Sequence, residues 1–139
     1  MIRAMTLGPI GQLSVNVKDV DRATAFYRDV LGLPFLFPAG TMSFFNCGGV
    51  RLMLGLPSAP EFDHPSSILY FKVDDILASH KALLAKGVVF KGDPHLVARL
   101  PDHELWIGFF TDTEGNTLAL MSEVTVAGLQ SEGGESRHS

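Results

Sequence analysis

The feature that most constrains this chain is an internal repeat with the order strand, helix, strand. Val17-Lys18-Asp19-Val20 matches Val73-Asp74-Asp75-Ile76, and Gly32-Leu33-Pro34-Phe35 matches Gly87-Val88-Val89-Phe90, both at an offset of about 55 residues. Chance could produce one match, but two matches in the same order at the same offset indicate a duplicated unit. In a chain of 139 residues, this predicts two modules within one domain.

The first copy has the pattern of a strand, a helix and three further strands. Residues 12–17 alternate apolar and polar side chains, which predicts a strand with one face on a core. Asp19 stands at the N-cap of a helix whose apolar residues recur at helical spacing, and Gly32 ends that helix. The further strands are predicted over residues 33–37, 41–47 and 50–56, with Gly48-Gly49 as the turn of a hairpin.

The second copy repeats this order after a proline-rich segment. Residues 68–73 alternate, Asp74 or Asp75 caps a helix, and Gly87 ends it. The apolar face of this helix comprises Ile76, Leu77, His80, Leu83 and Leu84. Strands are predicted over residues 88–90, 95–100, 105–111 and 117–124, with a turn over residues 101–104.

These elements predict an α+β fold of two βαβββ modules. We expect a curled mixed β-sheet with helices on its outer face and a cup on the other. The predicted segments are an N-terminal segment (1–10), a first module (11–57), a linker (58–66), a second module (67–126) and a disordered tail (127–139).

Composition and charge exclude several classes of partner. The net charge is -4 and the basic residues are dispersed among acidic ones, so no basic stripe for nucleic acid is present. No apolar run approaches the ~18 residues that span a bilayer, and residues 1–10 are too short for a signal peptide. The single cysteine, Cys47, is consistent with a reducing compartment. We therefore expect a cytoplasmic protein that binds neither nucleic acid nor membrane.

Three stretches carry a resemblance to a known superfamily. They are "VKDVDRATAFYRDVLGL" (17–33), "LYFKVDDI" (69–76) and "FFTDTEGNTLALM" (109–121). Over residues 11–124 the chain resembles the vicinal oxygen chelate superfamily of glyoxalases, bleomycin resistance proteins and extradiol dioxygenases. The resemblance implies paired βαβββ modules around a ligand cup, and a homodimer.

The resemblance also implies where a metal would be bound. Metal-dependent members hold one divalent ion through four His, Glu or Gln side chains on four strands, and the corresponding positions here are Gln12, Met53, Ile68 and Ala119. Only Gln12 offers an oxygen, because thioether, branched-alkyl and methyl groups do not bind hard divalent cations. A register shift of one residue supplies only Ser67 or leucines. We therefore expect no metal and no other cofactor, with a divalent metal ion as the alternative.

The histidines match no helix-based metal motif. His80 lies on the apolar helix face, where a packed structural role is expected. The roles of His64, His95 and His103 stay open between that of a surface residue and that of a ligand, acid or base. His103 and the adjacent Glu104 are the two weak catalytic candidates.

Strand parity selects a set of residues that face the cup. Arg51 shares the parity of Met53 and is interpreted as an anion anchor, with a surface arginine as the alternative. An apolar cup with a few polar groups is typical of a small-molecule site. The predicted ligand-binding residues are Gln12, Ser14, Arg51, Met53, Ile68, Tyr70, Ala119 and Met121.

Three functions are compatible with this sequence. The leading prediction is a metal-free small-molecule binding protein of the glyoxalase/bleomycin resistance type, with an aromatic or amphipathic ligand in the cup. The second is a lyase, isomerase or dioxygenase-like enzyme that uses a divalent metal or acid/base residues. The third is a protein that binds a partner and keeps only a vestigial cup. The identity of the ligand and the existence of a reaction stay open.

Overall fold

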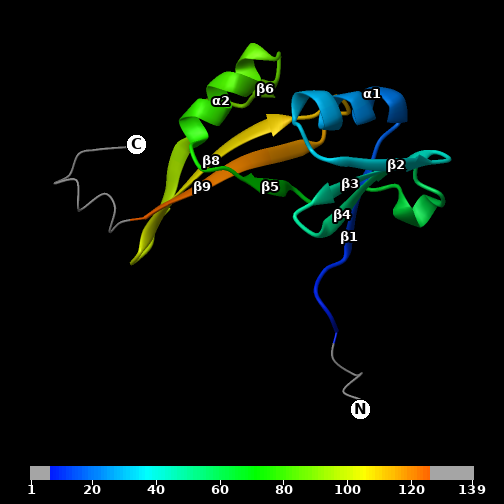
Figure 1. The fold of residues 1–139 in the computed structure, drawn as a ribbon, viewed down its shortest axis with the longest axis horizontal. Helices are drawn as coiled ribbons and strands as arrows, with labels where there is room; N and C mark the ends of the chain where they lie inside the picture. Colours follow the sequence, from blue (N-terminus) through cyan, green and yellow to red (C-terminus); the bar gives the residue numbers. More distant parts are fainter. Residues whose placement is uncertain (1–6, 126–139) are drawn as a thin grey trace. The chain divides into compact units, whose positions relative to one another are not determined.

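The computed structural model describes residues 7–125 of the chain (Figure 1). The boundary between its two compact units falls between Ser66 and Ser67. The predicted disordered tail, residues 127–139, lies outside the described residues. Among the described residues, no helix is both long enough and apolar enough to cross a membrane.

The first module is a four-stranded mixed sheet with a helical segment after its first strand and a short 3-10 helix after its last. Its elements are β1 (Gln12–Asn16), α1 (Val20–Ala25), the π-helical η1 (Phe26–Val30), β2 (Phe35–Ala39), β3 (Met42–Cys47), β4 (Val50–Gly55) and the 3-10 helix η2 (Pro60–Phe62). The strand order is β1-β4-β3-β2, with β1 parallel to β4 and the other pairs antiparallel. The first strand therefore lies beside the last, and the helical segment connects β1 to β2, the opposite edge of the sheet, across one face (Figure 1).

Local sequence signals explain where this helical segment begins and ends. The Asp19 carboxylate accepts a hydrogen bond of 3.0 Å from the backbone N–H of Arg22, which confirms the predicted N-cap. At the other end, Gly32 takes a φ of 76°, a left-handed conformation that few other residues adopt. The backbone N–H of Leu33 donates to the carbonyl of Tyr27, so Leu33 still belongs to the helix end and β2 begins only at Phe35.

One face of the first sheet packs against the helical segment. The ring of Tyr27 contacts that of Phe45, with centroids 6.1 Å apart, and the hydroxyls of Thr24 and Ser43 are 2.7 Å apart. Successive side chains of a strand point to opposite faces. The alternate residues therefore form a helix-free face of the first module, which comprises Gln12, Ser14, Phe44, Arg51 and Met53.

A β-bulge adds a further aromatic ring to this helix-free face. The register between β2 and β3 shifts between Phe35 and Phe37. Phe35 pairs with Phe45 on the helix side, whereas Phe37 pairs with Phe44 on the helix-free side. Without the bulge, Phe35 and Phe37 would point to the same face.

The second module repeats the first with one strand divided. Its elements are β5 (Leu69–Lys72), α2 (Ile76–Ala85), β6 (Val89–Phe90), β7 (His95–Arg99), β8 (His103–Thr111) and β9 (Thr117–Thr125). The order is β5-β9-β8-β6, β5 is parallel to β9, and β7 also pairs with β8. β6 and β7 pair with successive parts of β8, as one strand would. The α+β class and the two βαβββ modules are confirmed.

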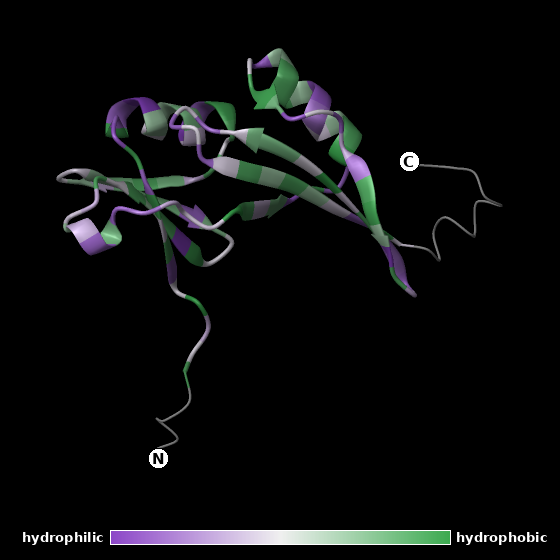
Figure 2. Cartoon of the chain, turned by 180° about the vertical axis from the view of Figure 1, so that it is seen from behind, coloured by the Kyte–Doolittle hydropathy of each residue, from purple (hydrophilic) through white to green (hydrophobic). Residues whose placement is uncertain are grey.

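The helix of this module packs less completely than its sequence pattern predicts. Asp75, rather than Asp74, caps α2 by accepting a hydrogen bond from the N–H of Ala78. Ile76 is buried, but Leu77 and Leu84 are 55% and 47% exposed, because only one stripe of a helix can contact a sheet. Figure 2 shows hydrophobic residues along α2 and along the strands that it packs against. The His80 ring lies edge-to-face against Phe90 at 4.4 Å, consistent with a packed structural role.

Two predicted irregular segments contain regular structure. The predicted turn over residues 101–104 is shorter, since His103 and Glu104 already pair with β9. The predicted linker holds η2, and the Asn16 side-chain amide donates to the backbone carbonyls of Phe62 and His64. These hydrogen bonds tie the segment to the first module.

The core assignment of the first sheet gives a stability prediction. Phe45 is fully buried between Tyr27 and Phe35, so Phe45→Ala should lower the free energy of unfolding by about 3 to 5 kcal/mol. Phe37→Ala is the matched control, because this ring is 44% exposed, and should cost about 1 kcal/mol or less. Urea denaturation measures both values, and equal losses would contradict the assignment.

Candidate functional site

The helix-free face of the first module carries one continuous row of side chains. The row crosses four strands, from Phe37 on β2 through Phe44 on β3 and Arg51 on β4 to Gln12 on β1. The Phe37 and Phe44 ring centroids are 4.9 Å apart, and the Arg51 guanidinium carbon lies 5.3 Å from the Phe44 centroid. Arg51 Nε donates a hydrogen bond of 2.8 Å to Gln12 Oε1. The row therefore joins an exposed ring, Phe37, and a buried ring, Phe44, to a positive charge.

The contacts of Gln12 and Met53 show whether the predicted metal positions of the first module could bind a cation. Gln12 Oε1, the only oxygen among the four, accepts the hydrogen bond from Arg51, and its Nε2 lies 3.9 Å from the Met53 sulfur. A guanidinium at hydrogen-bond distance also repels a divalent cation. Within residues 7–125, no group of three or more His, Cys, Asp or Glu side chains is arranged to hold a metal ion. These residues do not fit a metal.

Arg51 is exposed and keeps its charge available. Within residues 7–125 it forms no ion pair with a carboxylate, and its polar partner is the neutral amide of Gln12. Ser14, another predicted ligand-binding residue, pairs with Met53 and therefore shares this face. Asn16 shares the parity, but its amide is engaged by the backbone of residues 62 and 64.

The second module has an aromatic helix-free face of its own. Ala119 on β9 pairs with Tyr70 on one side and Phe109 on the other, and these two rings contact edge-to-face at 6.0 Å. Ala119 itself is fully buried, and Met121 follows it on the same face. Ile68 lies just before β5 and is 42% exposed. The structure thus brings Tyr70, Ala119 and Met121 together.

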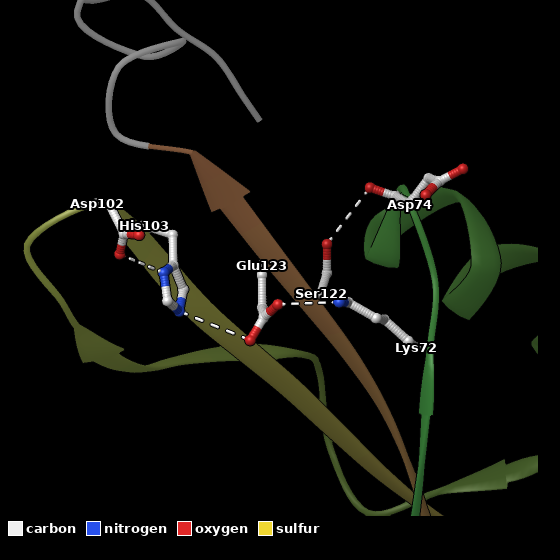
Figure 3. A network of polar contacts seen from close by, with 6 residues as sticks. All are labelled: Lys72, Asp74, Asp102, His103, Ser122 and Glu123. Carbon is white, nitrogen blue, oxygen red and sulfur yellow. Dashed lines mark hydrogen bonds and ion pairs between the residues drawn. The ribbon is translucent and has the colours of Figure 1, made fainter.

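A polar network continues this second face beyond Met121. Figure 3 shows Lys72, Glu123 and His103 pointing toward one another from β5, β9 and the start of β8. Lys72 Nζ lies 3.1 Å from Glu123 Oε1, and His103 Nε2 lies 3.6 Å from Glu123 Oε2. His103 Nδ1 lies 2.7 Å from Asp102 Oδ1. The imidazole therefore lies between two carboxylates and is oriented by the hydrogen bond with Asp102.

Comparison with known proteins identifies the family. Residues 9–120 match the family model described as the Glyoxalase/Bleomycin resistance protein/Dioxygenase superfamily. The chain belongs to this superfamily. A relative from Didymella fabae, described as a glyoxylase-like domain-containing protein, is 33% identical over 121 residues, which cover 81% of this chain and 92% of the relative.

Several solved structures share the fold of this chain. A member from Sphaerobacter thermophilus matches with a TM-score of 0.70 and 24% identity, covering 84% of this chain and 98% of its own. A lactoylglutathione lyase from Agrobacterium tumefaciens matches with a TM-score of 0.64 and 24% identity. The match covers 84% of this chain and 94% of the lyase chain. An antibiotic-binding protein from a Streptomyces species matches with a TM-score of 0.66 and 23% identity. The match covers 86% of this chain and 98% of the antibiotic-binding chain. The glyoxalase/bleomycin resistance fold thus occurs in an enzyme and in a binding protein, so site residues must decide between these functions.

The two catalytic candidates of this superfamily member do not act together. Glu104 follows His103 in β8 and so points to the opposite face, where it pairs with Arg99 at 3.1 Å. Sequence reasoning missed Glu123 as the partner of His103. The sequence pattern could have placed Glu123 on the same sheet face, because it has the parity of Ala119 and Met121 in the last strand.

The remaining nucleophile and base candidates are His64, His95 and Cys47. Among the described residues, the ring nitrogens of His64 and His95 contact backbone carbonyls, those of Pro65 and Asp93. Burial raises the pKa of the Cys47 thiol, which disfavours the reactive thiolate.

The network on the second module predicts a change in one titration. The hydrogen bond from His103 holds the pKa of Asp102 below its usual range. Asp102 therefore stabilises the fold at pH values above its ordinary pKa, and this contribution is lost as the pH falls through the lowered pKa. His103→Ala should raise the pKa of Asp102 toward its ordinary value, as measured by carboxyl ¹³C NMR titration.

His95→Ala is the matched control for this titration. His95 contacts the backbone of Asp93 and not Asp102, so its removal should leave the pKa of Asp102 unchanged. An Asp102 titration that is the same in wild type and His103→Ala would show that the hydrogen bond does not form in solution.

Proposed function

We propose that this chain is a metal-free small-molecule binding protein of the glyoxalase/bleomycin resistance type. Its ligand is aromatic or amphipathic and lies in the cup of the curled sheet. One observation carries the proposal: the only oxygen ligand at the four metal positions, Gln12 Oε1, is bound to Arg51. Met53, Ile68 and Ala119 supply no donor for a hard cation.

The helix-free faces support ligand binding of this kind. They combine aromatic and thioether side chains with a small number of polar groups, which is the usual composition of small-molecule sites. The aromatic members are Phe37 and Phe44 in the first module and Tyr70 and Phe109 in the second. The fold likeness to an antibiotic-binding protein is compatible with this function but is only an analogy.

The absence of a metal requirement is directly measurable. Elemental analysis of dialysed protein should find far less than one equivalent of Zn, Fe, Ni or Mn per chain. Addition of these ions should leave the melting temperature unchanged, because an ion that does not bind the native state cannot stabilise it. Stoichiometric metal after dialysis would contradict the proposal.

Binding itself is tested by thermal shift. Metal-stripped protein should be stabilised by at least one member of a panel of aromatic and amphipathic compounds, with the same shift in EDTA. Ala119→Trp should weaken binding of that compound at least about tenfold, because the indole displaces Tyr70 and Phe109 from above Ala119. Stabilisation that is lost in EDTA would favour the metal-dependent alternative.

We further propose a cytoplasmic homodimer. Within residues 7–125, both sheets end in edge strands that are paired on one side, β1 and β2 in the first module and β5 and β6 in the second. Association of copies would cover such edges. Sedimentation equilibrium should give the mass of two 15.1 kDa chains at micromolar concentration. The mass of one chain would refute the dimer.

The polar network gives an acid/base enzyme as the second candidate. A histidine that is oriented by one carboxylate and adjacent to another has the arrangement of a general base. His103 has this arrangement, since Asp102 orients it and Glu123 lies beside it. A lyase or isomerase of this kind would lose turnover in His103→Ala and keep it in His95→Ala. A pure binding protein would turn over none of the compounds that stabilise it.

A further inference from the structure

We infer that Arg51 binds the anionic group of the ligand and that the ligand class is an aromatic carboxylate. This inference rests on the proposed function and specifies the chemistry of its ligand. It follows from the charge, the orientation and the surroundings of Arg51 on the helix-free face of the first module.

The first step is the charge. Arg28 lies 2.8 Å from Asp29 and Arg99 lies 3.1 Å from Glu104, so both of these arginines have carboxylate partners. Arg51 is exposed and, within the described residues 7–125, makes no such ion pair. A guanidinium is charged at every physiological pH and pairs well with carboxylates. An exposed arginine of this kind on a sheet face favours the binding of an anionic ligand from solution.

The second step is orientation. Arg51 Nε is held by Gln12 Oε1, and the guanidinium lies over the Phe44 ring. With Nε engaged, the two terminal nitrogens keep their N–H donors for a partner in the guanidinium plane. A carboxylate accepts two parallel hydrogen bonds from such a fork. Fixing the long side chain beforehand also lowers the entropic cost of binding.

The third step is the shape of the apolar surroundings. Phe44 lies beside Phe37 on the next strand, and Met53 lies two residues from Arg51 on the same face. Neighbouring strands are about 4.8 Å apart, so the row from β2 to β4 spans about 10 Å. That length fits a bicyclic aromatic acid whose ring packs against the exposed Phe37 ring and Met53, above the buried Phe44, and whose carboxylate reaches Arg51.

Two isosteric probes test the inference. 2-Naphthoate carries the carboxylate, and 2-naphthamide has the same ring system without the charge. Isothermal titration calorimetry should show at least tenfold tighter binding of 2-naphthoate to the wild-type chain, and the Arg51 Nε–Hε resonance should shift in ¹⁵N NMR spectra. The preference should weaken at high salt because the pair is exposed.

Three variants locate the anion site. Arg51→Gln should bring 2-naphthoate to the affinity of 2-naphthamide, whereas Arg28→Gln, the same change at a distant paired arginine, should leave the preference intact. Gln12→Glu should weaken 2-naphthoate alone, because its new carboxylate competes for Arg51. Unchanged melting temperatures would show that the variants fold.

The outcomes separate this inference from the proposed function. Equal affinity of the wild-type chain for both probes would overturn the inference and still support binding of aromatic ligands. A preference for 2-naphthoate that survives Arg51→Gln would place the anion site elsewhere and also overturn it. If neither probe binds, the aromatic carboxylate class is wrong, and the thermal-shift panel decides the proposed function separately.

Discussion

The parallel pairing of the first and last strands is the constraint on which each module depends. Parallel neighbours cannot be joined by a hairpin, so β1 reaches β4, and β5 reaches β9, only after a helical crossover and a return through antiparallel strands. The crossover helix covers one face of the sheet and leaves the other face of that sheet uncovered by it. The face available for a ligand is therefore set by topology.

The same pairing sets the chemistry of the first module. It fixes Gln12 opposite Arg51 and Ser14 opposite Met53 on adjacent strands. The amide oxygen at the first metal position is then in reach of a guanidinium, and the hydrogen bond of 2.8 Å between them follows. The positive charge on this face thus belongs to a side chain and is fixed in position by Gln12 and Phe44. Such a site attracts anions and repels metal ions.

The second module shows how the same topology carries a different surface. Its first and last strands bring Lys72 and Glu123 together, and the adjoining β8 adds His103. The aromatic pair Tyr70 and Phe109 and the polar network lie along one face, whereas Glu104 and Arg99 form a separate pair on the other. The two modules therefore share the path of the chain but carry different side chains on these faces.

The sequence by itself determined the repeat, the α+β class and most of the elements, because strand alternation, helix caps and glycine turns are local signals. The Asp19 cap and the parity of Gln12, Arg51 and Met53 needed no tertiary information. Parity could also have indicated Glu123, but nothing local distinguished it from other acidic strand residues.

Only the tertiary structure decided which of these side chains meet. The bulge after Phe35 changes the face of Phe37, and the start of β8 at His103 sets His103 and Glu104 on opposite faces. The contacts of Arg51 with Gln12 and Phe44 join residues that are 39 and 7 positions apart. Strand register determines such contacts, and register depends on the packing of the whole sheet rather than on any short segment of the sequence.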